Sequence, residues 1–100
     1  MKTTSLRPVL EASGSHAEAF NALAHLTRLQ VFFFLVKADR EVPVGEIQAA
    51  IDVPAPTLSH HLDVLRRAGL VHSRREERHI YCSVRRELVT ELVRLLTACC

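Results

Sequence analysis

Apolar residues in the middle of the chain recur at the spacing of an amphipathic helix. Leu58, Leu62 and Leu65 stand at positions i, i+4 and i+7, which gives one stripe along a helix. Pro56 suits the first turn, because its missing N–H would have no partner there. Gly69 suits the position just after the helix. The pattern therefore predicts a helix between Pro56 and Gly69.

Beyond Gly69 the pattern changes from helical spacing to alternation. Ile80, Cys82 and Val84 share one face of an extended segment, which is typical of a strand with one buried side. With the preceding extended residues this predicts a two-stranded hairpin whose tip is charged. Residues 74–78 at the tip lack glycine, so we expect a loop longer than two residues.

The chain before Pro56 predicts further helices and a helix-turn-helix. Ser-x-x-Glu from Ser15 and Thr-x-x-Gln from Thr27 have the form of capping boxes and predict two helix starts. A short helix over residues 44–51 precedes a tight turn into the helix at Pro56, which makes a helix-turn-helix. We read residues 1–14 as an N-terminal arm. Residues 15–100 form one mainly α-helical domain with a β-hairpin wing.

The last predicted helix, from about Arg85 onward, carries two adjacent apolar stripes. The stripes are Leu88, Leu92, Leu95, Cys99 and Val89, Val93, Leu96, Cys100. A helix packed only on its own domain needs one such stripe. The second predicts a homodimer whose two helix-turn-helix units reach successive major grooves.

Charge is distributed unevenly along this 100-residue chain, although the net charge is only +2. Residues 57–86 contain seven Arg and three acidic residues, net +4, while the remainder is net −2. This favours a phosphate-facing half. No apolar run approaches membrane length and no secretory signal begins the chain, so we expect a cytoplasmic protein with no membrane partner. Nothing resembles an enzyme's nucleophile, phosphate loop or carboxylate pair.

Polar residues opposite the leucine stripe are the candidate DNA contacts. Small hydrogen-bonding side chains approach base edges, and arginines reach phosphates. The candidates are Thr57, Ser59, His60, Asp63 and Arg67 on the helix and Arg74, Arg75 and Arg78 on the wing. The alternative is a polar face that is merely solvated. His61 is expected beside the core.

Three segments resemble the ArsR/SmtB family of winged helix-turn-helix repressors. Residues 22–29 are similar to that family's ALADPTRL segment, residues 57–71 to its TVSHHLKVLREAGLV segment, and residues 74–81 to its wing. Departures are Leu26, Asp63 and Glu77, where the family usually has Pro, Lys and Gly. The resemblance implies a homodimer that binds operator DNA and is released by a metal ion or metalloid.

The resemblance also suggests an inducer. Leu96-Thr97-Ala98-Cys99-Cys100 is similar to the ending of a subgroup that senses trivalent arsenic or antimony through cysteines. Both elements are soft and bond to thiolates. Cys99 and Cys100 are therefore the candidate ligands, with arsenic or antimony as inducer and no organic cofactor.

The third sulfur of such a site is left open by the sequence. Cys82 is a candidate, although its alternation with apolar neighbours favours a buried packing role. A partner subunit, an exogenous thiol or a longer natural chain could also supply it. Two other functions remain as alternatives, a repressor that responds to thiol oxidation or persulfide and a winged-helix protein-interaction module.

Overall fold

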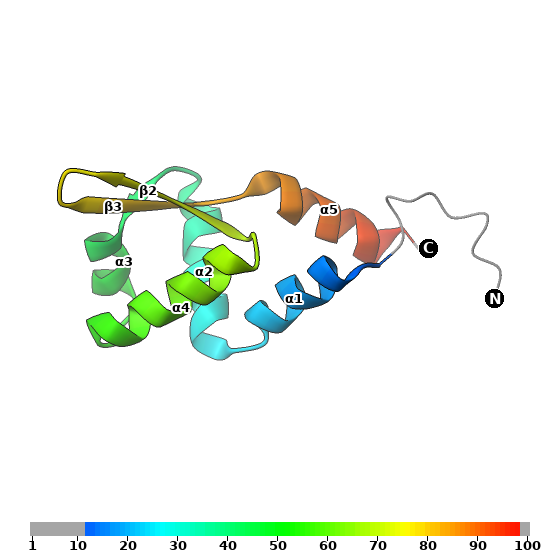
Figure 1. The fold of residues 1–100 in the computed structure, drawn as a ribbon, viewed down its shortest axis with the longest axis horizontal. Coiled ribbons are helices and arrows are strands. Elements are labelled where there is room, and N and C mark those ends of the chain that lie inside the picture. Colours follow the sequence, from blue (N-terminus) through cyan, green and yellow to red (C-terminus); the bar gives the residue numbers. More distant parts are fainter. Residues whose placement is uncertain (1–11, 99–100) are drawn as a thin grey trace.

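The structure is a computed structural model that describes residues 12–98. In chain order its elements are α1 (Gly14–Leu23), α2 (Leu26–Ala38), β1 (Val42–Pro43), α3 (Val44–Ala50), α4 (Ala55–Arg67), β2 (Val71–Glu76), β3 (His79–Val84) and α5 (Arg86–Thr97). The helices dominate, and β2 and β3 form the predicted wing at the opposite end of the molecule from α1 and α5 (Figure 1). This confirms the mainly α-helical fold with a wing.

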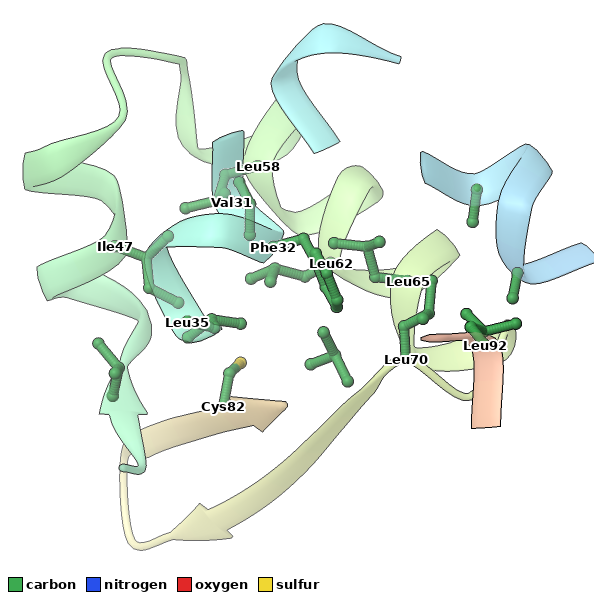
Figure 2. Close-up of a cluster of buried hydrophobic side chains, with 14 residues drawn as sticks. Val31, Phe32, Leu35, Ile47, Leu58, Leu62, Leu65, Leu70, Cys82 and Leu92 are labelled. Atoms are coloured by element: carbon green, nitrogen blue, oxygen red, sulfur yellow. The ribbon is translucent and has the colours of Figure 1, made fainter. Parts of the chain in front are cut away.

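α2 passes through the centre of the hydrophobic core. Val31, Phe32 and Leu35 are buried on it, and α1, α4 and β3 all pack against it. Figure 2 shows leucines of α4 reaching these side chains from one side and Ile47 of α3 from another. An apolar helix of this kind holds the other elements in fixed positions because they share one core.

The sheet has three strands, one more than predicted. The strand order is β1-β3-β2 and both pairings are antiparallel, with Val42 opposite Cys82 and Ser73 opposite Cys82 on the other side. β1 lies between α2 and α3, where the sequence pattern predicts no strand. Its two residues tie the base of the wing to the start of α3.

The wing turn contains two residues, so the prediction of a longer loop is wrong. Glu76 pairs with His79, which leaves Glu77 and Arg78 to make the turn. Glu77 adopts a left-handed conformation with φ of 56°. Glycine usually occupies such a position because a side chain there is disfavoured. The structure nevertheless closes the hairpin with Glu77.

Both predicted helix starts in the N-terminal half are corrected by two residues or less. α1 begins after Ser13, whose backbone N–H donates to Nδ1 of His16 at 3.0 Å, so Ser13 and not Ser15 caps this helix. α2 begins after His25, whose Nδ1 accepts the N–H of Thr27 at 3.2 Å. A histidine thus replaces the carboxylate that the sequence pattern assigned to the first capping box and the hydroxyl that it assigned to the second.

Residues 1–11 of the predicted arm lie outside the described residues, and Gly14 already belongs to α1. No single helix in residues 12–98 is long and apolar enough to cross a membrane. α1 and α2 together would pass on length and composition, but they are bent by 99° at their junction.

Candidate nucleic-acid interface

α4 separates a buried apolar face from an exposed polar face. Leu58, Leu62 and Leu65 are buried, and they anchor the helix against α2. Pro54 is the N-cap and Pro56 lies in the first turn, where a missing N–H costs nothing. Gly69 follows the helix with φ of 83°, a conformation that glycine adopts easily. The local sequence therefore fixes both ends of α4 and which face it buries.

The exposed face of α4 holds the residues that were predicted to read base edges. Thr57, Ser59 and His60 are all exposed, on the side away from the buried leucines. Two hydroxyls and an imidazole offer both hydrogen-bond donors and acceptors. α4 is 13 residues long, and its N-terminal part lies at the same end of the molecule as the tip of the wing, with α3 between the two (Figure 1). An exposed helix of this kind is able to enter a major groove.

The C-terminal end of α4 carries a three-residue ion network. Arg67 donates from Nε to Asp63 at 2.9 Å, and Arg66 donates to the other carboxylate oxygen. The hydrogen bond from Arg67 is the main reason that the pKa of Asp63 is lowered. Asp63 therefore orients two arginines, and its own oxygens are occupied. Arg67 remains well exposed beyond this contact, so its guanidinium can still approach phosphate.

Arg74, in the middle of β2, is held by intramolecular contacts. Its Nε and Nη2 donate to Glu41 at 2.9 Å each, and its Nη1 donates to Glu76 at 2.8 Å. The guanidinium also lies 4.9 Å from the centre of the Tyr81 ring. The prediction assigned these donors to phosphate, but the structure gives them to two carboxylates. Arg74 thereby fixes the wing to the residue before β1.

Arg75 and Arg78, the other two predicted wing contacts, are exposed near the hairpin tip. Exposed arginines on a projecting hairpin are able to meet phosphate or the minor groove. Their neighbours Glu76 and Glu77 are exposed as well. The wing therefore presents both signs of charge, with Arg75 and Arg78 as its available cations.

A cluster of basic side chains joins the first turn of α2 to the middle of α4. His61 is buried, as predicted, and its ring centre lies 4.6 Å from that of His25 and 5.7 Å from that of His60. Burial is the largest cause of the lowered pKa of His61, followed by the charges of His25, Arg28 and His60. No spacing in the sequence indicates that His25 or Arg28 lies against α4, because this contact joins two separate elements.

Cys82 lies in the core, in the position that a packing role predicts. It is 1% exposed, and Figure 2 shows its sulfur pointing toward the buried side chains around Leu35. Its Sγ is 3.6 Å from the hydroxyl of Ser73, and burial raises the pKa of the thiol. Cys99 and Cys100 lie outside the described residues. Within residues 12–98 no three His, Cys, Asp or Glu side chains gather to hold a metal ion.

α1 and α5 meet at the end of the molecule farthest from the wing (Figure 1). His16 of α1 is buried and bonds through Nε2 to the carboxylate of Glu91 on α5. Beside this contact Val93 and Leu96 of α5 are 54% and 63% exposed. Phe20 of α1 is exposed as well. This apolar end is where the second stripe of α5 was predicted to meet a partner subunit.

Comparison with known proteins gives one consistent class of relative. The family described as a helix-turn-helix domain matches residues 23–74. The transcriptional regulator KmtR of Mycobacterium tuberculosis is 43% identical over 76 residues, covering 76% of this chain and 57% of KmtR. This chain therefore spans little more than half of KmtR's length.

A second relative and a solved structure cover more of their own length. A biofilm growth-associated repressor of Agrobacterium fabrum is 37% identical over 92 residues, covering 91% of this chain and 77% of the repressor. The homodimeric winged helix-turn-helix DNA-binding domain of Mb0332 from Mycobacterium bovis superposes with a TM-score of 0.69 at 32% identity. That match covers 84% of this chain and 76% of the Mb0332 domain.

Proposed function

The chain belongs to the ArsR/SmtB family of winged helix-turn-helix transcriptional regulators, and we propose that it is a homodimeric repressor of operator DNA released by trivalent arsenic or antimony. The observation that carries the DNA-binding part is the exposed polar face of α4, opposite its buried leucines. The relatives named above are transcriptional regulators, in agreement with the prediction that the chain is not an enzyme.

In this proposal α4 supplies sequence readout and the wing supplies backbone contacts. Thr57, Ser59 and His60 face base edges in the major groove, where each base pair presents a distinct pattern of donors and acceptors. Arg67, Arg75 and Arg78 bind phosphates, which fix orientation without reading sequence. Asp63 and Arg74 act by holding neighbouring side chains in place, because their own polar atoms are engaged.

The proposed dimer joins the apolar ends of two protomers. Val93 and Leu96 would be buried against the same helix of the partner, where each buried side chain contributes up to a few kcal/mol. The homodimeric Mb0332 domain supports the formation of a homodimer. A two-fold axis would place the two α4 helices about one turn of DNA apart, which is the spacing of successive major grooves.

The proposed inducer site consists of Cys99 and Cys100 directly after α5. Two neighbouring thiolates suit a soft trivalent centre, and a third sulfur can come from a small thiol or from the partner subunit. Cys82 suits this role less well, since its thiol is buried among apolar side chains and α5 leads away from β3 (Figure 1).

Inducer binding would act by shifting a conformational equilibrium of the dimer. Cys99 and Cys100 follow the helix that is proposed to hold the two protomers together. A bound metalloid that favours another dimer geometry would move the two α4 helices off successive grooves. A coupling of about 1–3 kcal/mol, or roughly 5- to 150-fold in DNA affinity, is typical of such switches.

The test uses a duplex selected by the wild-type protein from a random library. Binding is measured by fluorescence anisotropy with and without arsenite, in a phosphine reductant that keeps the thiols reduced. We expect arsenite to release the wild type and Cys82→Ser, whereas Cys99→Ser/Cys100→Ser binds the duplex normally and resists release. Cys82→Ser is the matched control because it removes a thiol from the core.

Other outcomes separate the alternatives. Release of the tail double variant by arsenite would overturn the site assignment. Release of the wild type by an oxidant or persulfide, and not by arsenite, would favour a thiol-redox regulator. If no duplex is selected at any salt concentration, the chain is a protein-interaction module and the DNA-binding proposal fails.

A further inference from the structure

The basic cluster between α2 and α4 has no assigned role in the scheme above. It consists of His25 at the N-cap of α2, Arg28 in the first turn of α2, and His60 and His61 on α4. His61 is 6% exposed and lies between its two histidine neighbours, with ring centres 4.6 and 5.7 Å away. His25 and His60 are exposed, so the cluster opens to solvent on the same side of α4 as the residues proposed to read DNA.

Two buried polar atoms in this cluster have no hydrogen-bond partner within residues 12–98. They are Nδ1 of His61 and Nε of Arg28. Buried polar atoms are nearly always satisfied, because leaving one without a hydrogen-bond partner is destabilising. An unsatisfied buried polar atom in a native protein is a candidate for binding a ligand or an ion. Here both belong to side chains that can be cationic.

The charges around His61 are all of one kind. The groups that act on it are His25 and Arg28 from the α1–α2 side and His60 on α4 itself. The nearest acidic group on α4 is Asp63, and its carboxylate is engaged by Arg66 and Arg67. On α1, Glu18 lines a groove together with Arg67, which lies more than one helical turn after His61 on α4. The cluster therefore gathers cationic groups with no carboxylate of its own.

We propose that His25, Arg28 and His60, with His61 behind them, form a subsite that binds a phosphate of the DNA backbone beside α4. The proposal rests on the DNA-binding function above and extends the contact surface to the α1–α2 corner. Nδ1 of His25 accepts the N–H of Thr27, so the neutral ring carries its proton on Nε2 and can donate it to a phosphate oxygen. The N-terminus of the 13-residue α2 adds a favourable dipole.

A phosphate at this position would be bound together with protons. In the free protein, burial and neighbouring positive charges lower the pKa of His61. A phosphate dianion or diester beside the cluster offsets those charges, so the pKa of His61 rises in the complex. The complex then holds more protons than the separate components. By linkage, duplex affinity increases as the pH falls through the pKa that His61 has in the complex.

The experiment measures how the affinity for a random-sequence duplex depends on salt and on pH. Each phosphate contact contributes about 0.9 to the slope of log K against log salt. We expect Arg28→Gln to reduce the slope by about 0.9 for each protomer and the affinity by about tenfold or more. Arg28→Lys should restore most of the slope. His61→Gln should weaken the pH dependence, since glutamine donates a hydrogen bond but takes up no proton.

The matched control is Lys37→Gln, which removes an exposed cation from the last turn of the same helix. It should leave the slope unchanged. An unchanged slope in Arg28→Gln, or an equal loss in Lys37→Gln, would overturn the subsite. A folding defect lowers the active fraction of protein without altering the slope, so it cannot imitate the expected result.

Two further outcomes separate this proposal from the one on which it depends. Ser59→Ala should reduce discrimination between selected and random duplexes while keeping the slope, whereas Arg28→Gln should weaken binding to both equally. Inorganic phosphate alone is the remaining probe. If it stabilises the wild type against thermal unfolding and Arg28→Gln still binds duplex with an unchanged slope, the cluster binds free anions and the DNA contact is refuted.

Discussion

α4 and α5 are amphipathic helices of nearly equal length, 13 and 12 residues, yet they dispose of their apolar side chains differently. α4 buries Leu58, Leu62 and Leu65 inside the protomer and exposes small polar side chains. Within its 12 residues α5 fully buries Leu92 alone, although it contains five other Leu and Val residues. Of these, Val93 and Leu96 are more than half exposed.

The chemistry of the exposed face therefore indicates what kind of surface each helix can meet. The exposed face of α4 is rich in hydroxyl, imidazole and guanidinium groups, which exchange hydrogen bonds with water for hydrogen bonds with DNA. That of α5 offers Val93 and Leu96, which gain free energy only when another apolar surface removes them from water. The first helix is complete within one protomer, and the second is completed by a partner in the proposed dimer.

The largest effect should come from removing the anchor of α4. Leu65→Ala leaves a cavity in the core, and we expect the free energy of unfolding to fall by about 2–5 kcal/mol at any protein concentration. Leu96→Ala is the matched control, because it makes the same truncation on an exposed site of α5. Chemical denaturation at two protein concentrations distinguishes them, since Leu96→Ala should lower the stability mainly at the higher concentration, where dimerisation stabilises the wild type. Equal losses at both concentrations would contradict the contrast drawn here.

A second, slightly smaller effect should come from charging the exposed apolar face of α5. Val93→Asp/Leu96→Asp places carboxylates where the partner's apolar side chains would lie, which disfavours burial by several kcal/mol. We expect a folded monomer whose affinity for the selected duplex is reduced by about 100-fold or more, because one protomer contacts only one half-site. Sedimentation velocity and anisotropy measure the two quantities.

Thr90→Asp is the control for that experiment, since Thr90 is exposed on the polar side of α5. It should leave both the dimer and the DNA affinity intact. A double variant that stays dimeric would show that the subunits meet elsewhere. A double variant that unfolds, by circular dichroism, would mean that these side chains support the protomer itself.

The contrast between α4 and α5 was predictable from sequence because both patterns are local. The leucine spacing in α4 and the two stripes of α5 each lie within a few turns, and helical geometry converts spacing directly into faces. The candidate base-reading residues Thr57, Ser59 and His60 follow from the same geometry, and the structure exposes all three. Burial of His61 was predictable on the same ground.

Contacts between separate elements were not predictable in this way. Arg74 lies 33 residues from Glu41, and nothing in the spacing of either residue indicates that the two pair. β1 is recognisable only through its pairing with β3, since two residues have no periodicity. The contact between the rings of His25 and His61 likewise depends on how α2 packs against α4. The capping residues were predicted wrongly for another reason, because several hydroxyl and imidazole groups within one turn compete to cap the helix.

The smallest of these effects should come from removing the negative charge of Asp63 on the exposed polar side of α4. Asp63 engages both Arg66 and Arg67, so Asp63→Asn should release two guanidinium groups. Both remain close to the DNA that α4 is proposed to bind. We expect the affinity for random duplex to rise about three- to tenfold at low salt, with a steeper salt dependence. Affinity for the selected duplex should rise less, because freed arginines add backbone contacts and no base readout.

Asp39→Asn provides the matched control for this substitution. Asp39 accepts a hydrogen bond from Arg86 at 2.6 Å, so Asp39→Asn makes the same change in net charge and also frees an arginine, but the site lies at the end of α2 and not on α4. Asn also tolerates the left-handed conformation of Asp39. If both variants gain affinity for random duplex equally, the gain reflects net charge alone. If only Asp63→Asn gains, the carboxylate on α4 limits non-specific binding, and the polar face of this helix favours selectivity over strength.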